Sequence, residues 1–288
     1  MRLSLRNEQA RVRDGWKSVF FILAAMACFA VVGFVGHALP AAVRAYAPSA
    51  ILITVLGVGI TWAATRLEGA SLASIGLKLD GRFLREWGVG TLAGMAMIAA
   101  TAVAVCALAG VRLSALHAPT AAAEAKLVVT FLGGAIFEEL LFRGYPFQRA
   151  MRGLGTWPAI LVFAALFCLG HVPGNLDVGA ASLTVAMANI FTNGIFQSQL
   201  LLRTRSLALP IGLHFGWNLL QQALGFGVSG IASSNAWFQA SLGQEPGWLT
   251  GGGFGLEASV FALAMQVVLI VLMMGGTGAP RQQRALAA

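Results

Sequence analysis

Charged residues inside an apolar run are the feature of this sequence that points most directly to chemistry. The stretch FEELLFRG, residues 137–144, follows the apolar run VVTFLGGAI and carries Glu138, Glu139 and Arg143. An ionised side chain at the centre of a membrane-spanning helix costs about 2.5–3.5 kcal/mol on insertion scales. Charges kept at such positions therefore indicate function unless a partner neutralises them.

The spacing of these three residues separates a pair from a single acid. Glu139 and Arg143 are four residues apart, so on a helix they share one face and can form a hydrogen-bonded ion pair. Glu138 points about 100° away from Glu139, and Leu141 and Phe142 occupy the positions of its potential helical partners. We therefore expect Glu139 and Arg143 to be structural, and Glu138 to be available for chemistry.

Three further polar side chains lie in apolar stretches. His171 ends the run LVFAALFCLGH, and His214 lies four residues before Asn218 in PIGLHFGWN, on the same helix face. Counting about 1.5 Å per residue away from the turn at 153–156 places Glu138 and His171 at a similar depth. A carboxylate, two imidazoles and a carboxamide are therefore expected to converge.

This set of groups can catalyse hydrolysis in two ways. A desolvated glutamate can act as a general base, while imidazole and carboxamide groups can stabilise an oxyanion. Two histidines and a glutamate are also a known zinc ligand set. The residues therefore leave open a bound Zn²⁺ or other divalent metal, held by Glu138, His171 and His214, and a metal-free mechanism based on Glu138.

The composition excludes a water-soluble fold. The 288 residues are 58% hydrophobic and only 10% charged, whereas soluble domains carry about 25% charged residues. The net charge of +8 comes from basic residues in short loops rather than from a basic stripe, which argues against a nucleic-acid partner. Cys28, Cys106 and Cys168 lie in apolar runs without CxxC spacing and predict no disulfide framework.

The hydropathy pattern predicts a single all-α, polytopic membrane domain over residues 1–288, with about eight transmembrane helices. The expected spans are 18–38, 50–65, 88–110, 125–145, 157–173, 179–202, 208–226 and 256–275. With both termini cytoplasmic, 16 of the 19 Lys and Arg residues fall on the cytoplasmic side, as the positive-inside rule requires. The remaining three are Arg44, Arg112 and Lys126. We expect the loop 227–255 on the outside, as an exposed flexible loop.

Three motifs in a fixed order carry a family resemblance. EELLFR (138–143) resembles an EExxxR motif, FCLGH (167–171) resembles FxxxH, and HFGWN (214–218) resembles HxxxN. The ordered set is similar to that of the CAAX prenyl protease and bacteriocin-processing (CPBP, or ABI) family. That family includes the type II CAAX prenyl endopeptidase and bacterial self-immunity proteins. The core that carries the motifs covers about residues 125–225.

The resemblance implies an intramembrane endopeptidase whose cavity faces the cytoplasm. Glu138 and His171 would activate the attacking water, and His214 and Asn218 would stabilise the oxyanion. The supporting residues would be Glu139, Arg143 and Phe167. The resemblance leaves the metal question open, because family members are described both as metalloproteases and as metal-free glutamate enzymes.

The sequence leaves the substrate open and favours one class of function over two others. The expected substrate is a membrane protein or peptide in a bacterial inner (plasma) membrane, and the oligomeric state is not indicated. A catalytically silent scaffold, or an immunity protein that binds a partner, is the main alternative; retention of all four catalytic-type residues argues against it. A transporter would show inverted repeats, and none is visible.

Overall fold

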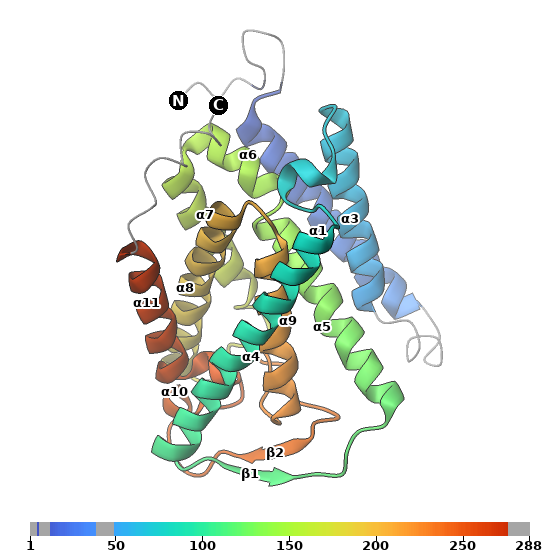
Figure 1. The fold of residues 1–288 in the computed structure, drawn as a ribbon. Coiled ribbons are helices and arrows are strands. Elements are labelled where there is room, and N and C mark those ends of the chain that lie inside the picture. The colour runs from blue at the N-terminus through green and yellow to red at the C-terminus, as the bar shows by residue number, and fades with distance from the viewer. Residues whose placement is uncertain (1–4, 6–11, 39–48, 276–288) are drawn as a thin grey trace.

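The computed structural model describes residue 5, residues 12–38 and residues 49–275, and it is built mainly from helices (Figure 1). The long helices are α1 (Asp14–Ala38), α3 (Ser49–Leu67), α4 (Gly81–Leu108), α5 (Ala121–Phe142), α7 (Thr156–Gly170), α8 (Ala180–Thr204), α9 (Ala208–Ala223) and α11 (Val260–Gly275). The shorter helices are η1 (Leu72–Ile75), α6 (Tyr145–Leu154), α10 (Gly247–Thr250) and η2 (Leu256–Ala258). Two strands, β1 (Arg112–Ala115) and β2 (Phe238–Ser241), pair in an antiparallel arrangement.

Each expected span coincides with one of the long helices. Within the described residues, α1, α3 and α4 are long and apolar enough to cross a membrane. The helices α7 and α11 are apolar but shorter. The chain is therefore a helical membrane protein, while the count of eight spans and the cytoplasmic termini remain predictions.

Two segments differ from the expectation. The helix expected over 125–145 ends at Phe142, and α6 begins at Tyr145. Gly144 separates them because its backbone packs so closely on Leu140 that a side chain would clash. The segment 227–255, expected to be a flexible loop, is instead folded: it contains β2 and α10, and Phe254 is fully buried within it.

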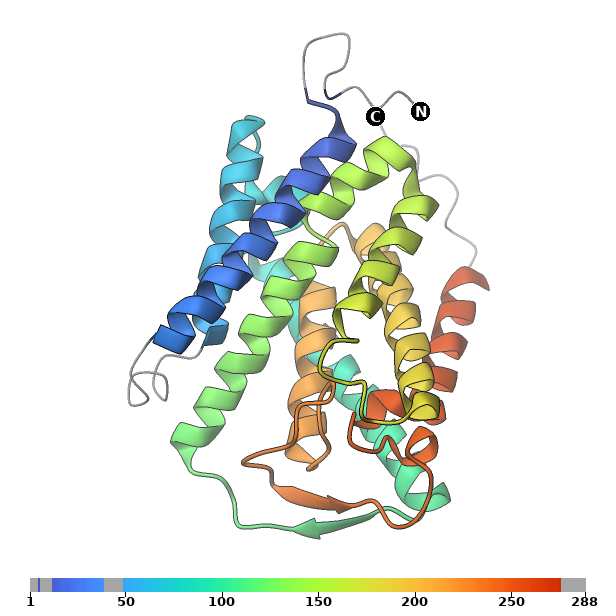
Figure 2. The same cartoon turned by 180° about the vertical axis from the view of Figure 1, so that it is seen from behind.

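The two ends of the bundle differ in charge. Figures 1 and 2 show which elements lie at each end. The basic end comprises the start of α1, the α3–α4 connection, α6 and the α8–α9 connection. The sheet end comprises β1, β2 and the segments 171–179 and 224–259. Basic residues that the structure describes at or near the basic end are Arg13, Lys17, Arg66, Lys78, Arg82, Arg85, Arg143, Arg149, Arg152, Arg203 and Arg205. In the same part of the chain, Arg112 and Lys126 are the basic residues nearer the sheet end; Arg2, Arg6, Arg11, Arg44, Arg281 and Arg284 lie outside the described residues.

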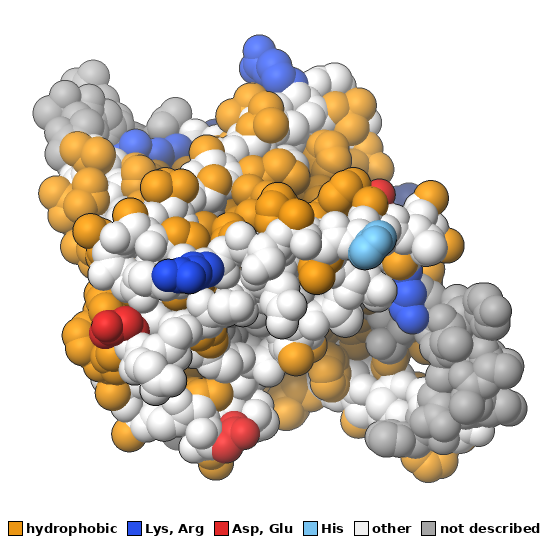
Figure 3. Space-filling model, turned by 90° about the horizontal axis from the view of Figure 1, so that it is seen from below, with side chains coloured by type: hydrophobic (Ala, Val, Ile, Leu, Met, Phe, Trp, Pro, Cys, Tyr) orange, Lys and Arg blue, Asp and Glu red, His pale blue; other side chains and the backbone are white. Residues whose placement is uncertain are grey.

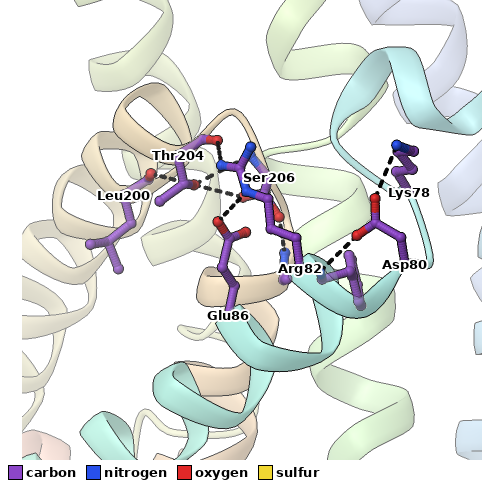
Figure 4. A network of polar contacts seen from close by, with 9 residues as sticks. Lys78, Asp80, Arg82, Glu86, Leu200, Thr204 and Ser206 are labelled. Atoms are coloured by element: carbon purple, nitrogen blue, oxygen red, sulfur yellow. Dashed lines mark hydrogen bonds and ion pairs between the residues drawn. The ribbon is translucent and has the colours of Figure 1, made fainter.

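A polar network at the basic end fixes the start of α4 (Figure 4). The Asp80 carboxylate caps the helix by accepting from the Phe83 amide at 2.9 Å and pairs with Lys78 at 3.0 Å. The amide and the ammonium group together lower the pKa of Asp80 below its usual value. Arg82 pairs with Glu86 at 2.7 Å and donates to the Thr204 carbonyl at 2.8 Å, which ties α4 to the end of α8.

The helix that carries His214 is held against α4 by glycines on both partners. Gly90 and Gly94 of α4 lie against the backbone of α9, and Gly212 and Gly216 of α9 lie against the backbone of α4. A Cβ atom at any of these four positions would overlap a carbonyl oxygen of the facing helix. Small residues four apart allow this close approach in membrane helices. The pairing therefore sets the position of α9 and of the side chains on its other face.

We expect Gly94→Ala to destabilise the protein by about 1–3 kcal/mol, the usual cost of overpacking a tight contact. The matched control is Gly88→Ala on the same helix, where a Cβ atom meets nothing within 4 Å. Thermal unfolding of the purified variants in detergent measures the difference. Equal midpoints for the two variants would show that the close approach does not constrain α9.

Candidate active site

The four residues expected to do chemistry come from three helices and line one cavity. Glu138 lies on α5 one turn before its end, His171 is the C-cap of α7, and His214 and Asn218 lie on α9. All four side chains border a cavity of about 750 Å³. The acid, the two imidazoles and the carboxamide therefore share one chamber.

Glu139 and Arg143 form the ion pair expected from their spacing, and a histidine joins them. Arg143 Nη1 lies 3.1 Å from Glu139 Oε1, and both side chains are essentially inaccessible to solvent. The same Oε1 lies 3.0 Å from Nδ1 of His214. The sequence predicted the first contact but gave no sign of the second, because His214 is 75 residues further along the chain. Glu139 therefore positions a residue of the cavity in addition to neutralising Arg143.

Phe167 packs at the centre of this group. Its ring lies 4.6 Å from the Arg143 guanidinium carbon, a cation–π distance, and its centroid is 4.8 Å from that of His171. It also contacts Phe142 edge-on, at 4.9 Å between centroids. One buried aromatic ring thus contacts both the Arg143 guanidinium and the His171 imidazole. This placement fits the supporting role expected for Phe167.

The hydrogen bonds of the two histidines determine which ring nitrogen is available. His171 Nδ1 lies 2.8 Å from the carbonyl oxygen of Phe167. A carbonyl can only accept, so Nδ1 carries the proton and Nε2 is left as the free nitrogen. The same reasoning applies to His214, whose Nδ1 faces the Glu139 carboxylate. Both imidazoles are therefore anchored through Nδ1 and available through Nε2.

Glu138 is the carboxylate without a fixed partner. Its Oε2 is buried and has no hydrogen-bond partner within the described part of the chain. This oxygen lies 3.7 Å from Nε2 of His214, too far for a direct hydrogen bond. About a third of the Glu138 side chain is exposed to the cavity, at 32%. The Glu138 side chain thus borders the chamber, while its buried Oε2 lies near an imidazole nitrogen without a hydrogen-bond partner among the described residues.

A comparison with protein-family models bears on this constellation. Residues 120–220 match the model described as type II CAAX prenyl endopeptidase, Rce1-like. Over these residues, the chain is similar to the Rce1-like family. The matched segment is about a third of the chain and contains all seven of the residues singled out above. The resemblance read from the three motifs is confirmed. No curated protein and no solved structure matched in the corresponding comparisons.

The sequence left open whether Glu138, His171 and His214 bind a metal ion. Among the residues that the structure describes, no three His, Cys, Asp or Glu side chains gather closely enough to hold a metal ion. His214 Nε2 and Glu138 Oε2 approach each other, but His171 does not complete a ligand set with them. The donors as placed do not form a ready three-ligand site.

A second, smaller chamber of about 30 Å³ also borders His171, His214 and Asn218. This volume is sufficient for a water molecule. Other polar residues that line the chamber are Asn189, Asn193, Gln197, Ser229, Glu257 and Gln266. Both polar atoms of Gln197 and the side-chain oxygen of Gln266 are buried without a protein partner in the described chain. Ordered water is the partner that such groups require.

Glu257 is a polar residue of this region that sequence reasoning missed. Its carboxylate accepts from Gln221 at 2.5 Å and from the Ser229 hydroxyl at 3.3 Å. Asn175 donates to the carbonyls of Ser229 and His171, so these contacts connect the Glu257 carboxylate to the backbone at His171. Like Glu138, Glu257 is a single acidic residue beside an apolar run in the sequence. This pattern could have identified Glu257 as a candidate site residue.

Proposed function

We propose that this protein is an intramembrane endopeptidase that hydrolyses a peptide bond in a membrane-associated protein or peptide. The observation that carries the proposal is Glu138, whose side chain borders a cavity shared with two anchored imidazoles and a carboxamide, and whose buried Oε2 has no hydrogen-bond partner among the described residues. A desolvated carboxylate of this kind is suited to general-base chemistry. The similarity of residues 120–220 to an endopeptidase family supports the same reaction type.

The proposed reaction begins with a water molecule held by Glu138 and His171. Glu138 takes a proton from the water as its oxygen attacks the carbonyl carbon of the scissile bond, and His171 accepts a hydrogen bond from the water through its free Nε2. The tetrahedral intermediate then collapses as the C–N bond breaks. The proton held by Glu138 passes to the leaving amine, so the carboxylate is restored.

In this proposal His214 and Asn218 stabilise the oxyanion. They lie one turn apart on α9 and border the same cavity. An imidazolium at His214 would donate from Nδ1 to Glu139 and from Nε2 into the chamber, while the Asn218 amide supplies a second donor. Donors fixed in advance for the developing charge are typically worth 10²–10³-fold in rate each. Glu139, Arg143 and Phe167 support this arrangement by holding the His214 ring and the packing around it.

The cavity suits a peptide better than a small metabolite. Its volume of about 750 Å³ accommodates several residues. One wall is largely apolar and comes from α1 and α5, with Phe29, Leu127 and Phe131. Polar side chains that also line the cavity include Asn175, Ser229 and Ser234. A peptide at a membrane surface presents both apolar and polar groups. These lining residues do not specify which side chains the substrate carries or whether it is lipid-modified.

No step of this mechanism is routed through a metal, because the donors as placed do not form a three-ligand site. Glu138, His171 and His214 remain the residues that would have to move together to bind one. Elemental analysis of the purified protein distinguishes a metal-dependent mechanism from the glutamate mechanism.

A comparison of membrane proteomes tests the function. We expect cells that carry Glu138→Ala to accumulate at least one full-length membrane-associated protein that cells with the intact protein convert to a shorter form. Terminal-peptide mass spectrometry measures the cleavage site, and re-expression of the intact protein should restore cleavage. Identical termini in both strains, with equal amounts of the two proteins in the membrane, would favour a silent scaffold.

A further inference from the structure

The catalytic cavity extends from Glu138 in one direction only, towards the sheet end. Along α5 its wall is formed by residues that lie mainly three or four apart, on one helix face. The wall residues of α5 are Ala123, Lys126, Leu127, Thr130, Phe131, Gly134 and Glu138. Ala123 and Glu138 are 15 positions apart, which corresponds to about 22 Å of helix. The cavity is therefore a deep cleft along the half of α5 that leads away from its basic end.

The sheet end supplies the other residues that line the opening. The segments after α7 and α9 contribute residues 173–175 and 228–235, with Ser233 excepted. Several of these are open to the surroundings, and Ile231 is 74% exposed. Figure 3 looks onto this end and shows few charged side chains on it, among polar, backbone and hydrophobic atoms.

Towards the basic end, by contrast, the chain is tightly packed. Leu140, Phe147 and Phe163, each at most 3% exposed, belong to one buried hydrophobic cluster. The cluster continues through Ile211 on α9, one turn before His214 towards the same end. The buried Glu139–Arg143 pair lies beside this cluster. Neither water nor a peptide can approach Glu138 through close-packed side chains, so the mouth of the cavity is at the sheet end.

The charge distribution assigns a side of the membrane to each end. Of the basic residues that the structure describes, those at the basic end far outnumber Arg112 and Lys126 nearer the sheet end. Under the positive-inside rule, the basic end is cytoplasmic. The cavity would then open away from the cytoplasm, although the sequence motifs led us to expect a cytoplasmic opening.

We propose that the protein takes its substrate from the non-cytoplasmic side of the membrane, as a peptide segment that enters between α5 and the 228–235 segment. The substrate named in this inference rests on the proposed endopeptidase function. The direction in which the cavity opens does not depend on that function. Along that path the cavity presents mostly apolar side chains from α1 and α5, and both apolar and polar side chains from 228–235. The fitting substrate class is a membrane-anchored protein or peptide with its cleavage site just outside the anchor, on the non-cytoplasmic face.

Cysteine accessibility tests the direction directly. In a variant with Cys28, Cys106 and Cys168 replaced by alanine, a single cysteine is placed at Ala232 on the mouth or at Leu79 on the basic end. Both positions are exposed, Leu79 at 79%, and the two variants form a matched pair. We expect a membrane-impermeant maleimide to label Ala232→Cys in intact spheroplasts of a bacterial host, and to label Leu79→Cys only after lysis.

The reverse labelling pattern would overturn the proposed direction, and so would labelling of both positions, or of neither, before lysis. The same reagent separates this inference from the enzymatic one. If the protein cleaves a substrate, modification of Ala232→Cys from outside should lower cleavage in intact spheroplasts relative to the same variant before labelling. Outside labelling without any detectable cleavage in the intact protein would retain the direction and reject the proposed function. Cleavage that continues at an unchanged rate after complete labelling of Ala232→Cys would reject entry by this mouth.

Discussion

Replacing Glu138 by glutamine is expected to lower peptide hydrolysis by about 10²–10⁴-fold, the usual contribution of a positioned general base. Glutamine keeps the shape of the side chain and its hydrogen-bonding ability but cannot take a proton from water. Because the Glu138 carboxylate is not part of the Glu139–Arg143 pair, the fold should be unaffected. The effect should therefore be confined to kcat. Single-turnover cleavage of a substrate by purified enzyme in lipid measures it.

The matched control for this prediction is Glu124→Gln. Glu124 lies in the first turn of the same helix and does not border the cavity. The Glu124→Gln variant should leave both cleavage and thermal stability unchanged. If Glu138→Gln kept near-native activity while the control behaved as expected, Glu138 would not be the base. Should Glu138→Gln instead unfold the protein, its unpartnered oxygen would have a structural role that the described contacts do not contain.

The local features of this fold could be read from the sequence because each has a short-range cause. The eight apolar stretches predict helices at the right places, since 20 apolar residues in a bilayer satisfy their backbone groups best as a helix. The Glu139–Arg143 pair follows from a spacing of four residues on one helix face. The break after Phe142 has a similar local cause in Gly144, although the apolar pattern continues across it and concealed the break.

Features that depend on the approach of distant segments could not be read in the same way. The contact between Glu139 and His214 spans 75 residues and depends on the glycine-mediated packing of α9 on α4. The strand pair joins Arg112–Ala115 to Phe238–Ser241, which no local pattern links. The direction in which the cavity opens is of the same kind, because it depends on which side chains fill the space beyond Glu138. The depth of a residue along its helix could be counted from the sequence. The side from which a substrate reaches the cavity could not.

Replacing Glu139 by glutamine is expected to destabilise the protein by about 3–5 kcal/mol, the cost of leaving a buried charge without its partner. Arg143 is 1% exposed, and its cation–π contact with Phe167 does not replace a carboxylate. Thermal or denaturant unfolding in detergent measures the loss. The control is Glu86→Gln, which breaks a Glu–Arg pair with the same spacing; Arg82 there is 61% exposed and stays hydrated. That variant should lose less than about 1 kcal/mol.

A double variant separates the two roles of Glu139. In Glu139→Gln with Arg143→Met, both buried charges are removed, and most of the lost stability should return because a packed apolar side chain replaces the ion pair. Activity should not return, since His214 Nδ1 still lacks the carboxylate that orients its ring and supports an imidazolium. Recovery of stability with persistently low kcat and an unchanged KM would identify Glu139 as a positioning residue for His214. If activity returned together with stability, Glu139 would serve only to neutralise Arg143, and the hydrogen bond to His214 would have no part in the reaction.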